Sequence, residues 1–170
     1  MGKKLLQRVL SVILVGLTLS AVGCGPTVHQ RQASFVESEY VRFTEEGTGV
    51  LVGQAFLKTR AGDVKYAAGN EVVLNPVTSY STEWFNVGVK GNQALSDPDP
   101  RVGTYTRTVV ADGEGRFEFR NLPPGDYYVA TAIFWEVPSG AYGSLTTTGD
   151  WIGSRVTVRD GETTRIIVSS

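Results

Sequence analysis

The sequence is poor in the residues from which many catalytic and metal sites are built. Its 170 residues include one cysteine, Cys24, and one histidine, His29. One cysteine excludes an intrachain disulfide and a cysteine-rich zinc site, and one histidine is too few for the usual His-based metal cluster. A nucleophile paired with a histidine base would have to use His29, in a polar N-terminal segment. We therefore expect no enzyme activity and no cofactor.

A marked excess of positive charge is also missing. The chain has 16 Lys and Arg against 17 Asp and Glu, a net charge of −1 at pH 7. Proteins that bind nucleic acid usually need a basic face to displace counterions from phosphates, so we expect no nucleic-acid partner. The 41% of hydrophobic residues is enough for one packed core in a chain of one-domain length.

The N-terminus has the pattern of a secretory signal. The uncharged apolar run Val9–Leu19 is shorter than the roughly 20 apolar residues of a membrane-spanning helix. The basic residues Lys3, Lys4 and Arg8 precede it, and small residues follow it up to Cys24. This order is typical of a signal peptide that is removed.

The residues Ala21-Val22-Gly23-Cys24 resemble the lipobox of bacterial lipoproteins. The resemblance implies cleavage between Gly23 and Cys24, diacylglycerol on the Cys24 thiol and a fatty acid such as palmitate on the new amino group. Gly25, where an Asp would favour the inner membrane, favours the outer membrane. We expect a signal peptide over residues 1–23 and a lipidated tether over 24–46, with the membrane as partner. The alternative is ordinary cleavage, with Cys24 an unmodified small residue.

Short strand patterns separated by turn residues fill the rest of the chain. The clearest is Arg116–Arg120, in which Phe117 and Phe119 alternate with charged residues. Dipeptides such as Asp160-Gly161 mark tight turns between such runs. Strands are expected at 49–58, 71–74, 105–111, 116–120, 127–137, 151–159 and 163–168. The pattern predicts one all-β domain over 47–170, an antiparallel β-sandwich of six to eight strands.

One part of this pattern resembles a known family. Gly115–Val129 has the order G-x-F-x-F, L-P-x-G and x-Y-x-V of carboxypeptidase regulatory-like domains, which are transthyretin-like (prealbumin-like) seven-stranded β-sandwiches. Glu71–Pro76 fits the V-x-L-x-P strand of that family. The resemblance covers about Thr48–Val168 and implies the fold without an activity, because the zinc domain of the carboxypeptidases is a separate unit.

Residues 78–103 are the longest segment without a strand pattern. Tyr80–Phe85 is expected to form a helical turn, with Ser81 or Thr82 as its cap. Near the other end, Asp97 and Asp99 offer carboxylate oxygens and are candidates for a calcium site. Solvated turn residues are the alternative interpretation of the same pair.

Large aromatic residues are concentrated in or beside the loop-like segments. Trp84, Phe85, Tyr142 and Trp151 are candidates for a ligand-binding surface, because exposed aromatic faces stack on sugars and peptide side chains. The alternative is that they pack the long segment onto the sandwich. Two functions follow as hypotheses. One is a non-catalytic interaction or structural module at the bacterial envelope, with a protein partner. The other is a carbohydrate- or peptidoglycan-binding sandwich.

Overall fold

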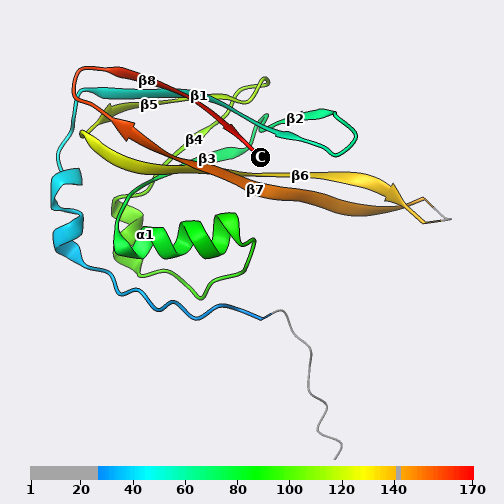
Figure 1. Cartoon of the computed structure of the whole chain (residues 1–170), viewed down its shortest axis with the longest axis horizontal. Coiled ribbons are helices and arrows are strands. Elements are labelled where there is room, and N and C mark those ends of the chain that lie inside the picture. Colours follow the sequence, from blue (N-terminus) through cyan, green and yellow to red (C-terminus); the bar gives the residue numbers. More distant parts are fainter. Residues whose placement is uncertain (1–26, 141–142) are drawn as a thin grey trace, which may run out of the picture.

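The computed structural model describes residues 27–140 and 143–170 and has two facing β-sheets (Figure 1). The prediction of an all-β sandwich is confirmed, and its eight strands lie within the predicted six to eight. One sheet contains β1 (Gly49–Lys58), β2 (Val64–Tyr66), β5 (Arg116–Leu122) and β8 (Thr163–Ser169). The other contains β3 (Glu71–Pro76), β4 (Arg107–Val110), β6 (Gly125–Ser139) and β7 (Ser144–Val158).

The strand pairing is antiparallel throughout these sheets except between β1 and β8, which run parallel. The second sheet has the order β4-β3-β6-β7. Residues 144–149, which precede the strand expected at 151–159, also belong to β7 and pair with 134–139 of β6. The distal half of this long hairpin projects beyond the rest of the sandwich (Figure 1).

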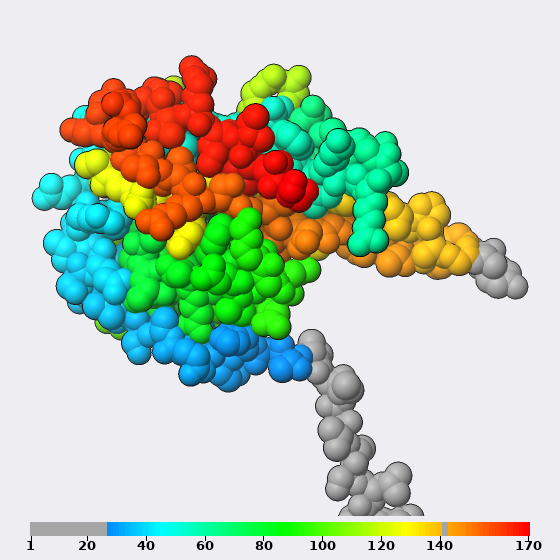
Figure 2. Space-filling view, in the orientation of Figure 1, coloured from blue at the N-terminus to red at the C-terminus, as the bar shows by residue number. Residues whose placement is uncertain are grey.

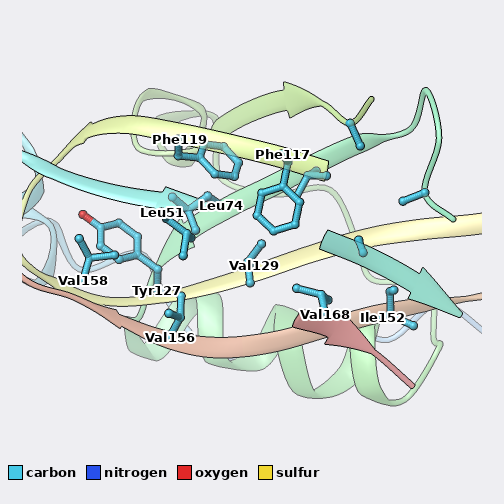
Figure 3. Packing of buried hydrophobic residues seen from close by; sticks show 14 of the residues in the cluster. Leu51, Leu74, Phe117, Phe119, Tyr127, Val129, Ile152, Val156, Val158 and Val168 are labelled. Carbon is cyan, nitrogen blue, oxygen red and sulfur yellow. The ribbon is translucent and has the colours of Figure 1, made fainter. Parts of the chain in front are cut away.

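The alternation of side chains along β6 gives the second sheet two apolar faces. Tyr127 and Val129 point inward to the main core, where Leu51, Leu74 and Phe119 also lie (Figure 3). Tyr128 and Ala130 point to the opposite face and belong to a smaller cluster under the helical segment. Because successive strand residues face opposite sides, an apolar run such as 127–130 must be covered on both.

The helical segment begins at Thr78. Its Oγ1 accepts a hydrogen bond from the Ser81 backbone N–H at 3.1 Å, and Ser81 Oγ accepts one from the Thr78 N–H at 2.9 Å. This reciprocal capping starts α1 (Ser79–Glu83), which continues as the π-helical segment η3 (Trp84–Lys90). The expected turn is therefore present, but its cap is Thr78 and not Ser81 or Thr82. A short 3₁₀ turn, η4 (Pro100–Thr104), follows.

Residues 27–43, which we call the strap, lie along the outside of the body (Figures 1 and 2). Within the segment expected to be a tether, they contain two 3₁₀ turns, η1 (Glu37–Glu39) and η2 (Val41–Phe43). Tyr40 is 1% exposed and Phe43 7% exposed. Because a 3₁₀ helix repeats every three residues, these turns bury both aromatic side chains on one side.

The predicted signal peptide and lipidated Cys24 lie outside the described residues. Among the residues that the structure describes, no helix has the length and apolar character needed to cross a bilayer.

Candidate functional site

A cleft lies where the helical segment, the strap and β7 meet, and we call it the Trp cleft. Its volume is about 230 Å³. It adjoins a groove of about 490 Å³, and the two share Arg31, Trp84, Pro98 and Trp151. The remaining residues that line the cleft are Val73, Asn75, Tyr80, Ser81, Val102 and Thr106.

The helical segment packs directly on the sheet at Gly153 of β7. A Cβ at this position would lie 2.9 Å from Phe85 Cε2 and 2.9 Å from Val89 Cγ1. Lys90 Nζ donates a hydrogen bond to the Gly153 carbonyl oxygen at 2.8 Å. This close approach brings Trp84, one residue before Phe85, and Trp151, two residues before Gly153, to the same cleft.

Phe85 has a different role from the one expected for it. Its ring stacks on Tyr128, with centroids 4.1 Å apart and planes 13° apart, and Phe85 is 7% exposed. Phe85 therefore anchors the helical segment to β6 and does not line the cleft. Of the four predicted aromatic residues, Trp84 and Trp151 come together there, whereas Tyr142 lies outside the described residues.

Gly88 leaves room for Leu95 beside the Trp84 indole. A Cβ on Gly88 would lie 2.9 Å from Leu95 Cδ1 and 3.5 Å from Trp84 Cδ1. The first distance is too short for a real contact and the second is an ordinary one, so the glycine lets Leu95 approach the helical backbone next to the indole. The tryptophan is thus held by packing against its own helix, so less side-chain freedom is lost if a ligand stacks on it.

Glu83 fastens the strap to the helical segment. Its carboxylate accepts hydrogen bonds from the backbone N–H groups of Gln32, at 2.8 Å, and Ala33, at 2.9 Å. The same carboxylate lies 3.0 Å from His29 Nε2. These bonds, that from Gln32 first, lower the pKa of Glu83. The carboxylate stays ionised at neutral pH and keeps the strap against the helix, where Figure 2 shows it.

The strap contributes Arg31 to the cleft. Its backbone N–H donates to Ser96 Oγ at 3.1 Å, and its Nε–H donates to the Ser96 carbonyl oxygen at 3.0 Å. The guanidinium carbon lies 5.0 Å from the centroid of the Tyr80 ring. Sequence reasoning missed Arg31 because a single arginine in a polar, aperiodic segment carries no local signal.

Asp97 and Asp99 have different surroundings. Asp99 caps η4, and its carboxylate accepts bonds from the guanidinium of Arg101 and from the Arg101 backbone N–H, which lower the pKa of Asp99 to about 2. Asp97 lines the groove beside the Trp cleft. Within residues 27–140 and 143–170, no three or more His, Cys, Asp or Glu side chains are grouped to hold a metal ion.

Comparison with solved structures shows a likeness in fold. No protein-family model matches the chain, and no curated protein matches it. A crystal structure of a candidate carbohydrate-binding protein from Pseudomonas aeruginosa is similar, with a TM-score of 0.70 and 26% sequence identity. The likeness covers 81% of this chain and 99% of that chain. The two proteins therefore share an all-β architecture over most of their length.

Proposed function

We propose that this chain is a non-catalytic, lipid-anchored protein of the bacterial envelope whose Trp cleft binds a carbohydrate. The observation that carries the proposal is the meeting of Trp84 and Trp151, from distant parts of the sequence, in one cleft. A sugar ring has an apolar C–H face that stacks on indole, while its hydroxyls need polar partners at the rim.

Polar groups in the cleft support this proposal because they are held in place. Asn75 is buried, and its Oδ1 accepts a hydrogen bond from Thr106 Oγ1 at 2.6 Å. Ser81 is held by its bond to the Pro76 carbonyl oxygen at 2.6 Å. Preorganised polar groups give specificity at a low cost in entropy. The likeness to the Pseudomonas aeruginosa protein gives independent support.

The surroundings of the one histidine support binding over catalysis. His29 bonds to Glu83 at 3.0 Å and is not among the residues that line the cleft or the groove. No Asp or Glu is among the residues that line the cleft, and Asp97 is the one acid among those that line the groove. Because a general base must reach the group that it deprotonates, this arrangement favours a site that holds its ligand without reacting with it.

We also propose that the sandwich is of the carboxypeptidase regulatory-like, transthyretin-like type. The residues that carry the resemblance form β5 and the start of β6, with Phe117 and Phe119 buried together on one face. Tyr127 donates a hydrogen bond to the Pro123 carbonyl oxygen at 2.7 Å, which fixes the turn between the two strands. The burial of this phenol raises its pKa to about 12.

A panel of envelope oligosaccharides tests the carbohydrate proposal. We expect at least one to shift the tryptophan fluorescence of the full chain, kept in a detergent that contains no sugar. Trp151→Ala should weaken that binding about tenfold or more, since burying a large aromatic side chain contributes about 1.5–3 kcal/mol. Tyr66→Ala, at an exposed aromatic residue on β2, is the matched control and should bind normally. Unchanged fluorescence over the whole panel would remove the proposal.

The lipid anchor has its own test. In a phase separation with Triton X-114, we expect the full chain from its native host to enter the detergent phase, because acyl chains contribute about 0.8 kcal/mol per buried methylene. Cys24→Ser should move it to the aqueous phase. A Cys24→Ser variant that still enters the detergent phase would show that Cys24 is not the anchor.

A further inference from the structure

Resting on the proposed function, we infer that the sugar bound in the Trp cleft carries a carboxylate, which Arg31 recognises. The inference starts from one atom. Arg31 Nη1 is buried and has no hydrogen-bond partner, and it is the only buried side-chain nitrogen or oxygen in this condition among the described residues. A buried N–H without an acceptor costs free energy, because it has lost its hydrogen bonds to water. This cost is greater when the group is charged.

The charge of Arg31 also lacks a carboxylate partner, in contrast to five surface arginines. Arg42, Arg60, Arg107 and Arg165 likewise form no ion pair among the described residues. Arg101, Arg116, Arg120, Arg155 and Arg159 each pair with an Asp or Glu carboxylate. Arg31 forms no such pair within residues 27–140 and 143–170, although it is less exposed than those surface arginines. Glu83 of α1, which contacts the strap next to Arg31, is occupied by the N–H groups of Gln32 and Ala33.

The position of Arg31 is fixed before any ligand arrives. A bond from its backbone N–H to Ser96 Oγ fixes the residue, and a bond from Nε to the Ser96 carbonyl oxygen, with the contact to the Tyr80 ring, holds the side chain at the cleft. A guanidinium forms charge-assisted hydrogen bonds to a carboxylate, and one that is already oriented loses little freedom on binding. Because Arg31, Trp84 and Trp151 line both the cleft and the groove, a ring stacked on either indole has its substituents near Arg31.

Asp97 limits how much negative charge the ligand can carry. It lines the groove that continues from the cleft, so an acidic group on every sugar unit would bring like charges together there. The ligand that fits both residues has a uronic or similar acidic sugar at Arg31 and a neutral sugar beside Asp97. A glycan of alternating acidic and neutral units has this chemistry.

Paired glycans test the inference on the full chain in sugar-free detergent by titration calorimetry. The probes are oligosaccharides containing glucuronic, galacturonic or N-acetylneuraminic acid, each beside the neutral oligosaccharide of the same linkage. We expect at least one acidic member to bind about tenfold or more tightly than its neutral counterpart, the ratio that one charge-assisted contact supplies. Raising the salt concentration should weaken the binding of the acidic glycan and leave the binding of the neutral glycan unchanged.

Two variants separate recognition from folding. Arg31→Gln should remove the preference for the acidic member, because both members then meet an uncharged side chain. Unchanged tryptophan fluorescence of the free variant would show that the cleft is still formed. Arg165→Gln, at an exposed arginine on β8 in the other sheet, is the control and should leave both affinities unchanged.

The outcomes distinguish this inference from the proposed function. Equal affinity for acidic and neutral members, or a preference that survives in Arg31→Gln, would overturn the role of Arg31 while the carbohydrate proposal stands. Tighter binding of a sulfated counterpart than of the carboxylated one would overturn the assignment to carboxylate. If neither acidic nor neutral members bind, the carbohydrate function itself is wrong.

Discussion

Gly153→Val is expected to separate the helical segment from the sheet and to destroy the Trp cleft. The Gly153 backbone lies in an ordinary extended conformation within β7, so the effect is steric. The new side chain would overlap Phe85 and Val89 and approach the Val129 carbonyl oxygen, which a Cβ alone would place 3.0 Å away. Overpacking of this kind costs about 1–3 kcal/mol, and we expect the upper end because the sheet cannot move aside.

The measurement is urea unfolding together with glycan binding on the same preparation. Gly153→Val should lower the free energy of unfolding and abolish binding at once, because one contact positions Trp84 and Trp151. Gly113→Val is the matched control, since a Cβ at Gly113 has no heavy atom within 4 Å. If Gly153→Val binds the glycan normally, the docking of the helix on β7 does not create the site.

Phe119→Ala is expected to give the largest loss of stability of any single substitution considered. Phe119 is 3% exposed, lies opposite Leu51 in the β1–β5 register and meets Phe117 edge-on at 6.0 Å between ring centroids (Figure 3). Truncation of a buried phenylalanine in a sandwich core costs about 3–5 kcal/mol, because it leaves a cavity as well as losing burial.

Phe134→Ala is the control for this loss. Phe134 lies on the projecting part of β6 and is 50% exposed. The same chemical change there should alter the free energy of unfolding by about 0.5 kcal/mol or less. Equal losses for the two variants in denaturant unfolding would contradict the placement of the Phe117–Phe119 face in the core.

The sandwich could be predicted from the sequence where alternation and turn chemistry coincide. Arg116–Arg120 shows this best, since Phe117 and Phe119 are buried and the charged residues between and beside them are exposed. The three-residue strand β2 was missed because none of its residues is buried and its pattern carries no periodic signal. The first half of β7 was missed because its residues are mostly small and polar. They form a strand because they pair with β6, and the local sequence does not show this pairing.

The candidate site was predicted in its parts and not as a whole. Trp84 and Trp151 were identified as loop-associated aromatics, and both line the cleft. Their meeting depends on the absence of a side chain at Gly153, which no local pattern signals. Phe85 was wrongly grouped with them because adjacent helical residues face different directions, and the sequence alone did not show which face the sheet would cover.

Arg31 could not be predicted for a different reason. Its role comes from contacts between the strap and a loop far along the chain, among them the His29–Leu95 bridge and the bonds to Ser96. Such pairing between an irregular strap and a loop leaves no periodic trace in either segment. The composition of the strap predicted only a tether, whereas the structure shows that Arg31 of the strap lines the cleft.

The most direct test of the central claim follows the three indole N–H signals of the ¹⁵N-labelled full chain by NMR while an envelope oligosaccharide is added. Trp135 packs against the main core and is absent from the cleft and the groove, so it serves as an internal control. We predict that the Trp84 and Trp151 signals shift together in a saturable manner while the Trp135 signal stays in place. A glycan that binds without moving the Trp84 and Trp151 signals, or a panel in which no glycan moves them, would contradict the account.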